Sequence, residues 1–213
     1  MAINNIDLKD RIINSARLLF KTQGYDQTTI RQLVSKCQIT TGTLYKYFDN
    51  KQDVFNAVRG DDLNRVKQFV QMITKETNEP LLFASIDTHI VFTLAQKYER
   101  YAEAIISSHK NHDVNQVHIS DLVEFSKLCF AGYIKNYSDH DYRTRALIIK
   151  GIYNSIIGDY LTGYDSDLSS KINLVVKSIY KLYNVPEAKI ESILLKTSEI
   201  MRQYETDLFK ILD

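Results

Sequence analysis

Several residue types are scarce in this 213-residue chain, and each scarcity excludes a class of protein. Two cysteines cannot build a disulfide framework, and both lie in apolar helical patterns, which predicts a reducing environment. No apolar run reaches the roughly 18 residues of a membrane-spanning helix. The first residues are charged and lack the apolar segment of a signal peptide. We therefore expect a cytoplasmic globular protein that makes no membrane contact.

The motifs of common enzyme classes are also missing. The sequence has no G-x-S-x-G motif, no glycine-rich phosphate loop and no Cys–His arrangement typical of a thiol enzyme. Four polar residues that lie close together match no known metal-site spacing, and a solvated loop is the simpler interpretation. They are His109, His112, Asp113 and His118. We therefore expect no enzyme activity, no metal and no cofactor.

Only two prolines and seven scattered glycines interrupt the chain, and apolar residues recur three and four positions apart almost everywhere. This spacing predicts an all-α protein of about nine to ten helices. The expected helices cover residues 7–23, 28–37, 40–47, 50–74, 80–98, 99–110, 116–138, 141–163, 167–184 and 186–211. Residues 1–50 are assigned to an N-terminal three-helix domain and residues 51–213 to a larger helical domain. The helix at 51–74 connects the two domains.

Charge is distributed unevenly between these domains. Residues 1–60 contain nine basic and five acidic side chains, a net charge of +4, whereas the remaining residues carry a net charge of −3. A basic small domain suits a protein that contacts a polyanion at one end only. A difference of this size also arises by chance, so it needs support from a motif.

Residues 29–47 have the pattern of two helices joined by a tight turn. The first helix begins with the spacing of a capping box, and the second begins at Thr40. Leu33, Ile39 and Leu44 are apolar anchors that can hold the two helices at a fixed angle, as in a helix-turn-helix. This arrangement presents the outer face of the second helix to the major groove of DNA.

The outer face of that second helix carries side chains suited to DNA. Threonine hydroxyls can bond phosphate or base edges, and tyrosine hydroxyls and a lysine can reach phosphate. Gly42 lets the backbone approach a sugar–phosphate strand closely. Lys51 opens the next helix, where free backbone N–H groups also attract phosphate.

A family resemblance adds to this pattern. The segment from Ile12 to Phe55 closely resembles the DNA-binding domain of TetR-type regulators, above all in the run T-G-T-L-Y-K-Y-F followed by Lys51. Gln38 departs from the resemblance, because the family often has glycine in this turn. The resemblance implies a helix-turn-helix regulator and adds Thr29 to the contacts. The predicted DNA-binding residues are Thr29, Thr40, Thr41, Gly42, Thr43, Tyr45, Lys46, Tyr47 and Lys51.

One short recognition helix buries little surface, so specific binding needs two half-sites, and we expect a homodimer on a palindromic double-stranded operator. Small residues four, three and four positions apart form a stripe that permits close helix contact. TetR-type proteins dimerise through a four-helix bundle, which the resemblance implies for this region. The predicted interface residues are Gly151, Ser155, Gly158, Thr162, Ile172, Val176 and Ile179. The stripe can alternatively pack inside its own subunit, and the role of the helix at 186–211 stays open.

Aromatic side chains are concentrated in the larger domain, which contains eleven of the fourteen tyrosines. Such side chains can line a cavity for an aromatic or amphipathic small molecule, although most belong to an ordinary core. The predicted effector-binding residues are His89, Phe92, Phe125, Cys129, Tyr133 and Asn154.

The sequence thus predicts a ligand-responsive transcriptional repressor that a small-molecule effector releases from its operator. The main alternative is a DNA-binding regulator without an effector. An enzyme and a protein-interaction module are further alternatives. The sequence names neither the operator nor the effector.

Overall fold

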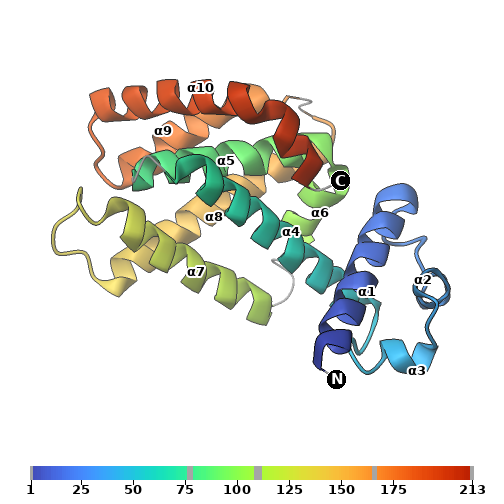
Figure 1. Cartoon of the computed structure of the whole chain (residues 1–213). Coiled ribbons are helices and arrows are strands. Elements are labelled where there is room, and N and C mark those ends of the chain that lie inside the picture. Colours follow the sequence, from blue (N-terminus) through green and yellow to red (C-terminus); the bar gives the residue numbers. More distant parts are fainter. Residues whose placement is uncertain (1, 76–78, 108–111, 165–166, 212–213) are drawn as a thin grey trace. The chain divides into compact units, whose positions relative to one another are not determined.

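The computed structural model describes residues 2–75, 79–107, 112–164 and 167–211, and these residues form helices and their connections without any strand (Figure 1). The α-helices of this described part are α1 (Ala2–Gln23), α2 (Ile30–Cys37), α3 (Thr41–Leu44), α4 (Lys51–Thr74), α5 (Pro80–Lys97), α6 (Glu99–Ser107), α7 (His112–Phe130), α8 (Asp139–Leu161), α9 (Ile172–Leu182) and α10 (Glu187–Ile211). A short 3-10 helix, Ser169–Lys171, precedes α9. The predicted all-α class is confirmed for these residues. None of the described helices is long and apolar enough to cross a membrane.

The chain divides into two compact units, Met1–Arg65 and Val66–Asp213. The boundary lies inside α4, which runs unbroken from one unit into the other. The sequence-based division at residue 50 assigns the whole of this helix to the larger domain. The structure instead gives the first turns of α4 to the smaller unit, because they help to close its core.

The smaller unit has its own apolar core. Its buried side chains come from α1, α2, α3 and the beginning of α4. They include Ile12, Ala16, Phe20, Leu33, Val34, Cys37, Leu44, Phe48, Val54 and Val58. Beside them the rings of Phe20, Tyr25 and Phe55 pack with centroids 4.8–5.5 Å apart. Removing these side chains from water is the main stabilising contribution to so small a unit.

Ion pairs fasten α4 to α1 within the smaller unit. Arg17 of α1 is only 5% exposed and pairs with both Asp61 and Asp62 of α4, donating from its Nε to Asp62 Oδ1 at 2.7 Å. Arg65 of α4 also reaches Asp61, at 2.8 Å. A buried guanidinium needs such partners because its desolvation is otherwise costly. The direction of α4 is therefore fixed at its base.

The larger unit is built around α5. This helix packs against α6, α7, α9 and α10, while α8 packs against α6, α7 and α9. In Figure 1, α10 covers one side of α5, and α7 and α8 lie on its other side. Ile190, Ile193 and Thr197 of α10 are fully buried, and Thr197 Oγ1 donates to Ser85 Oγ of α5 at 2.9 Å. The predicted C-terminal helix thus covers the core of its own chain.

One predicted helix, at residues 116–138, is wrong at its C-terminal end. The helix α7 ends at Phe130, and the segment 131–138 leads into α8. Within this segment Asn136 has a left-handed backbone, with φ 62°. Ser138 then caps α8 through a capping box with Asp141. A residue with positive φ cannot continue an α-helix, and a serine that caps a helix must precede it.

Candidate nucleic-acid interface

A capping box fixes the start of α2, as the spacing of Thr29 and Gln32 predicts. The Thr29 backbone N–H donates to Gln32 Oε1 at 2.8 Å, and the Gln32 backbone N–H donates to Thr29 Oγ1 at 3.2 Å. The Thr29 hydroxyl is exposed, but it is occupied by this cap.

The turn between α2 and α3 depends on Gln38. Its backbone is left-handed, with φ 53° and ψ 47°, and its N–H donates to Ser35 O at 3.1 Å. The Ile39 N–H then donates to Val34 O at 3.0 Å, which closes the end of α2. This is the glycine-like turn of a helix end, formed here with a glutamine. Glutamine in place of the family's usual glycine therefore adds backbone strain at residue 38, and the turn still forms.

A threonine pair opens α3. Thr40 is its N-cap residue, and its Oγ1 accepts from the Thr43 N–H at 3.1 Å. The Thr40 and Thr43 hydroxyls also lie 2.8 Å apart and share a hydrogen bond. Both hydroxyls are therefore held in fixed positions at the first turn of the helix.

Buried side chains support α3 from behind and leave its other side open. Leu44 is fully buried and Phe48 is 5% exposed, whereas Tyr45 is 49% exposed. Three neighbours are exposed as well, namely Thr41, Gly42 and Lys46. The helix predicted to reach residue 47 ends at Leu44, and Tyr45 and Lys46 lie in the turn that follows it. The helix and this turn together expose a hydroxyl, a bare backbone, a phenol and an ammonium.

Gly42 is not required by packing inside the chain. A Cβ placed on it would have Thr40 Oγ1, at 3.9 Å, as its nearest neighbour, which is an ordinary van der Waals contact. A side chain would therefore fit in the protein alone. The space in front of Gly42 is open to a partner that approaches the backbone.

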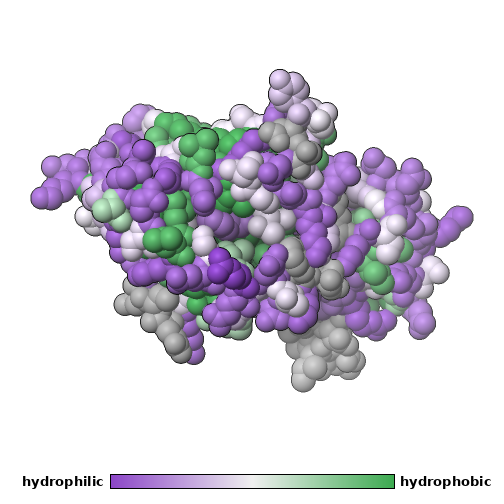
Figure 2. All heavy atoms as spheres, turned by 90° about the horizontal axis from the view of Figure 1, so that it is seen from above, coloured by the Kyte–Doolittle hydropathy of each residue, from purple (hydrophilic) through white to green (hydrophobic). Residues whose placement is uncertain are grey.

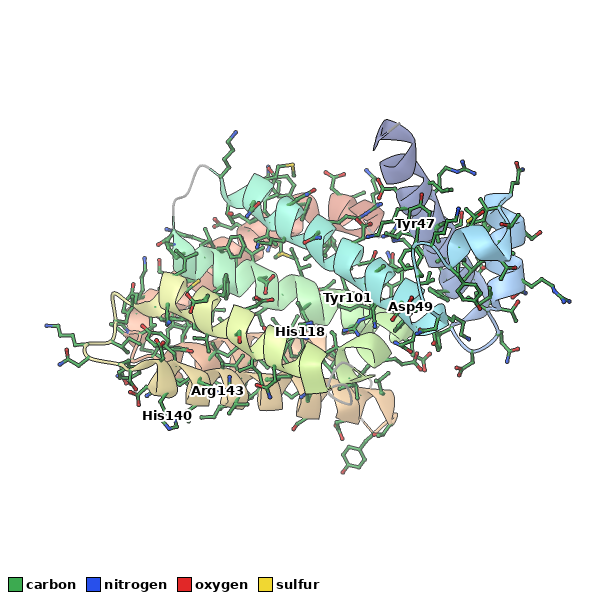
Figure 3. All side chains as sticks on the ribbon, turned by 90° about the horizontal axis from the view of Figure 1, so that it is seen from below. Tyr47, Asp49, Tyr101, His118, His140 and Arg143 are labelled. Atoms are coloured by element: carbon green, nitrogen blue, oxygen red, sulfur yellow. The ribbon has the colours of Figure 1, made fainter. Side chains whose placement is uncertain are left out.

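Two predicted contacts lie beyond the exposed side of α3. Tyr47 is half-buried, and with Asp49 it belongs to the segment that joins α3 to α4 (Figure 3). Lys51, the first residue of α4, donates from Nζ to Tyr25 O and Thr28 O, both at 3.0 Å. Its ammonium also lies 4.1 Å from the centroid of the Tyr25 ring. The side chain of Lys51 thus braces the loop between α1 and α2.

The sequence did not predict a second stabilising contact, which lies at the C-terminal end of α2. Arg11 of α1 donates from its guanidinium to Cys37 O at 2.8 Å and so satisfies a carbonyl at the end of α2. A helix leaves its last carbonyls without partners inside the helix, so such a donor stabilises the end. Nothing in the spacing of Arg11 and Cys37 signals this contact, because 26 residues separate them.

The predicted effector-binding residues have different neighbours. Phe92 is fully buried and packs edge-on against Tyr153 of α8, with ring centroids 5.1 Å apart. The His89 ring lies 2.8 Å from Ser85 O, and burial lowers its pKa, so it is neutral at pH 7. Phe125 packs against Phe83 at 5.5 Å. Three other members are buried or half-buried, namely Cys129, Tyr133 and Asn154.

The predicted interface residues divide into exposed and buried groups. Gly151, Ser155 and Thr162 are exposed on α8. Gly158 faces α6, since a Cβ on it would lie 3.8 Å from Ile106 Cδ1. The predicted members on α9 are in the core of the chain itself, at 0–5% exposure, so a partner cannot reach them. They are Ile172, Val176 and Ile179.

The histidine-rich segment falls mostly outside what the structure describes. His109 and the side chains of His112 and Asp113 lie outside the described residues, whereas His118 on α7 is half-buried. Among the residues that are described, no group of three or more His, Cys, Asp or Glu side chains is placed to hold a metal ion.

Comparisons with known proteins agree with this arrangement. The family model described as bacterial regulatory proteins, tetR family, matches residues 12–58. The transposon Tn10 TetC protein of Escherichia coli is 29% identical over 100 residues, which cover 47% of this chain and 45% of that protein. The match therefore spans less than half of the length of this relative.

Solved structures share the fold at low sequence identity. RolR in complex with resorcinol aligns with a TM-score of 0.67 and 17% identity, over 91% of this chain and 95% of RolR. Thermus thermophilus FadR, a transcriptional repressor in complex with lauroyl-CoA, aligns with a TM-score of 0.65 and 15% identity, over 84% of this chain and 96% of FadR. Residues 12–58, which contain the helix-turn-helix, thus match the tetR family of bacterial regulatory proteins, and the chain shares the fold of these solved structures.

Proposed function

We propose that the protein is a transcriptional repressor that binds a palindromic double-stranded operator as a homodimer and leaves it when a small-molecule effector binds the larger unit. The observation that carries this proposal is the short helix α3, which is capped by Thr40, anchored by Leu44 and open on its outer side. A side chain held in one orientation loses little freedom on binding, so it can discriminate between bases.

The hydrogen bonds of the free protein divide the predicted DNA contacts into two groups. Thr41, Tyr45 and Lys46 have exposed side chains and can reach base edges or phosphates directly. The hydroxyl of Thr29 and the ammonium of Lys51 are engaged by the chain itself. We therefore propose that Thr29 and Lys51 position the interface, and that Thr41 of α3 with Tyr45 and Lys46 of the turn after it contact the DNA.

We assign the dimer interface to exposed apolar and small residues of α8 and α9. Apolar side chains reach the surface of the larger unit, and Figure 2 shows hydrophobic patches on the face that is uppermost in Figure 1, where α10 lies. The interface residues are chosen by their exposure. On α8 the exposed members are Leu147, Ile148, Gly151 and Ser155, and on α9 it is Leu174, at 66% exposure. A Cβ on Gly151 would meet nothing within 4 Å, which leaves room for a closely packed partner helix.

An effector fits what is known of proteins with this fold. RolR was solved with resorcinol and Thermus thermophilus FadR with lauroyl-CoA. Effector and operator would weaken the binding of each other reciprocally, with a coupling of about 1–3 kcal/mol. A regulator that needs no effector is the second candidate. It would keep its operator affinity in the presence of every small molecule that binds the larger unit.

The test begins with selection of bound sequences from a random duplex pool at a stated salt concentration. We expect a palindromic site whose half-sites are about 34–36 Å apart. The variants Tyr45→Phe and Lys46→Ala should each weaken binding to that site by about tenfold. Matched controls are Tyr164→Phe and Lys21→Ala, which change exposed residues away from α3 and should leave affinity unchanged. Selection of no common sequence would contradict the proposal.

A further inference from the structure

The larger unit contains a carboxylate without a partner. Asp87 lies on α5 between Ile86, which is fully buried, and Thr88, which is 4% exposed. The Asp87 side chain itself is only partly exposed. Within the described part of the chain, its carboxylate has no hydrogen bond and no ion pair. A half-buried carboxylate is only partly solvated, so a cation that reaches it gains more electrostatic stabilisation than it would beside a fully solvated one.

Aromatic side chains lie on the same part of α5 as this carboxylate, and the charge of Asp87 is felt by Tyr153. One turn earlier on α5, the Phe83 ring packs against Phe125 of α7 with centroids 5.5 Å apart. On the other side, Tyr153 of α8 donates its hydroxyl to Thr88 Oγ1 at 2.9 Å, directly beside Asp87. The Tyr153 ring packs on Phe92. Groups from α5, α7 and α8 thus converge on one place.

Negative charge dominates the electrostatics of this cluster. Burial raises the pKa of Asp87 to about 6, so the carboxylate is mostly ionised at pH 7.5. Burial, and then the charge of Asp87, raise the pKa of the Cys129 thiol to about 12 and also raise the pKa of Tyr153. Both groups therefore stay neutral. Lys67 of α4 is the nearby cation, but its side chain is exposed and forms no ion pair with Asp87 among the described residues.

We propose that the Asp87 cluster binds an organic cation with an aromatic or apolar body, whose positive group pairs with the Asp87 carboxylate. The pairing compensates the isolated charge, and aromatic rings attract a cation to their faces. The inference deepens the proposed function and rests on it only in taking this ligand to be the effector. An anionic ligand is disfavoured because it would meet uncompensated negative charge.

Calorimetry with the full-length protein and no DNA tests the binding step. The probes are phenyltrimethylammonium and its neutral isostere tert-butylbenzene, which share size and shape. We expect the cation to bind at least about tenfold more tightly than the isostere. The variant Asp87→Asn should remove this preference. A wild type that binds both probes equally, or neither, would overturn the proposal, as would an Asp87→Asn variant that keeps the preference.

Two control variants separate this site from general surface attraction. Asp121→Asn removes an exposed carboxylate on α7 and should leave binding of the cation unchanged. Lys67→Gln removes the nearby positive charge and should leave binding equal or tighter. Weaker binding in Lys67→Gln would contradict the proposal, since Lys67 can only repel the ligand. A thermal melt of Asp87→Asn verifies that this variant is folded.

Operator binding is measured separately, so that the two proposals can fail independently. Release of the operator by phenyltrimethylammonium in the wild type, but not in Asp87→Asn, supports both. Release by an uncharged compound together with failure of the cation to bind overturns the cation site and leaves the repressor proposal standing. Binding of the cation by a protein that recognises no duplex overturns the repressor proposal and leaves the cation site standing.

Discussion

At the scale of single residues, Gln38 has an unfavourable backbone conformation. A left-handed conformation costs an L-residue about 1–2 kcal/mol, and glycine avoids that cost. The turn between α2 and α3 needs this conformation whichever residue occupies it. The family often has glycine at this position, and the φ of 53° at Gln38 shows why glycine is favoured there.

Gln38→Gly should stabilise the protein. We expect the free energy of unfolding to rise by about 0.5–1 kcal/mol, because relief of the strain exceeds the extra freedom that glycine gives the unfolded chain. Urea denaturation measures the change. The control is Ser35→Gly, which places glycine in the right-handed helix α2 and should lower the free energy of unfolding by about 0.5 kcal/mol. Destabilisation by both changes would contradict the argument.

Asp87 should make stability depend on pH. Its folded pKa of about 6 lies above the ordinary 3.8, so the folded state prefers the protonated form. The stabilising contribution of that proton is complete below about pH 4 and is lost as the pH rises through 6. Lys67, Cys129 and Tyr153 are the titratable groups that face it.

Asp87→Asn should therefore be more stable than the wild type by up to about 3 kcal/mol at pH 8, and by about half as much at pH 5. Denaturant titrations at the two pH values measure this difference. A difference that stays constant between pH 5 and pH 8 would show that Asp87 is as well solvated in the folded protein as in the unfolded chain.

Side-chain hydrogen bonds could be predicted from the sequence where donor and acceptor lie close together along the chain. The Thr29–Gln32 box and the Thr40 cap follow from spacing alone. The role of Lys51 did not follow, because it depends on carbonyls 23 and 26 residues away that only folding brings near. Asp87 was missed for the same reason, since its isolation is a property of the packed helices.

At the scale of elements, the attachment of α4 to α1 decides how the smaller unit holds together. Arg17→Met should lower the free energy of unfolding by about 3–5 kcal/mol, because two carboxylates lose a buried partner. Arg65→Met removes a more exposed guanidinium, whose side chain is 39% exposed, and should cost less than about 1 kcal/mol. Urea denaturation compares the two, and equal costs would contradict the importance of burial.

The helices themselves were largely predictable, because apolar periodicity and caps are local signals. Periodicity failed at residues 131–138, where apolar residues continue but Asn136 and the Ser138 cap redirect the backbone. Periodicity also did not separate buried from exposed residues on α9. The outer face of α9 carries Asn173, Lys177 and Lys181, and Leu174 is its one strongly exposed apolar residue, whereas Ile172, Val176 and Ile179 are buried.

At the scale of the whole molecule, the proposed homodimer depends on the exposed residues of α8 and α9. Leu174→Glu should shift the protein from dimer to monomer, because it places a charge in an apolar contact. The matched control is Leu195→Glu on α10, which is 68% exposed and lies outside the proposed interface. Sedimentation at several concentrations measures the shift. Dissociation by both variants, or only by Leu195→Glu, would place the interface elsewhere.

The proposed role of each unit could be predicted in part from the sequence. The basic charge and the motif of residues 12–58 both assign the proposed DNA binding to the smaller unit. The boundary at residue 65 was not predictable, because no linker marks it and the periodicity of α4 continues through it.

The central claim is that α3 reads DNA sequence, and the most direct measurement compares affinity for the selected operator with affinity for a scrambled duplex across a series of salt concentrations. We expect the wild type to keep a preference of at least about a thousandfold for the operator. Tyr45→Phe and Lys46→Ala should reduce that preference, whereas Lys21→Ala should not. A wild type that binds both duplexes with the same salt-dependent affinity, unchanged by either α3 variant, would contradict the account.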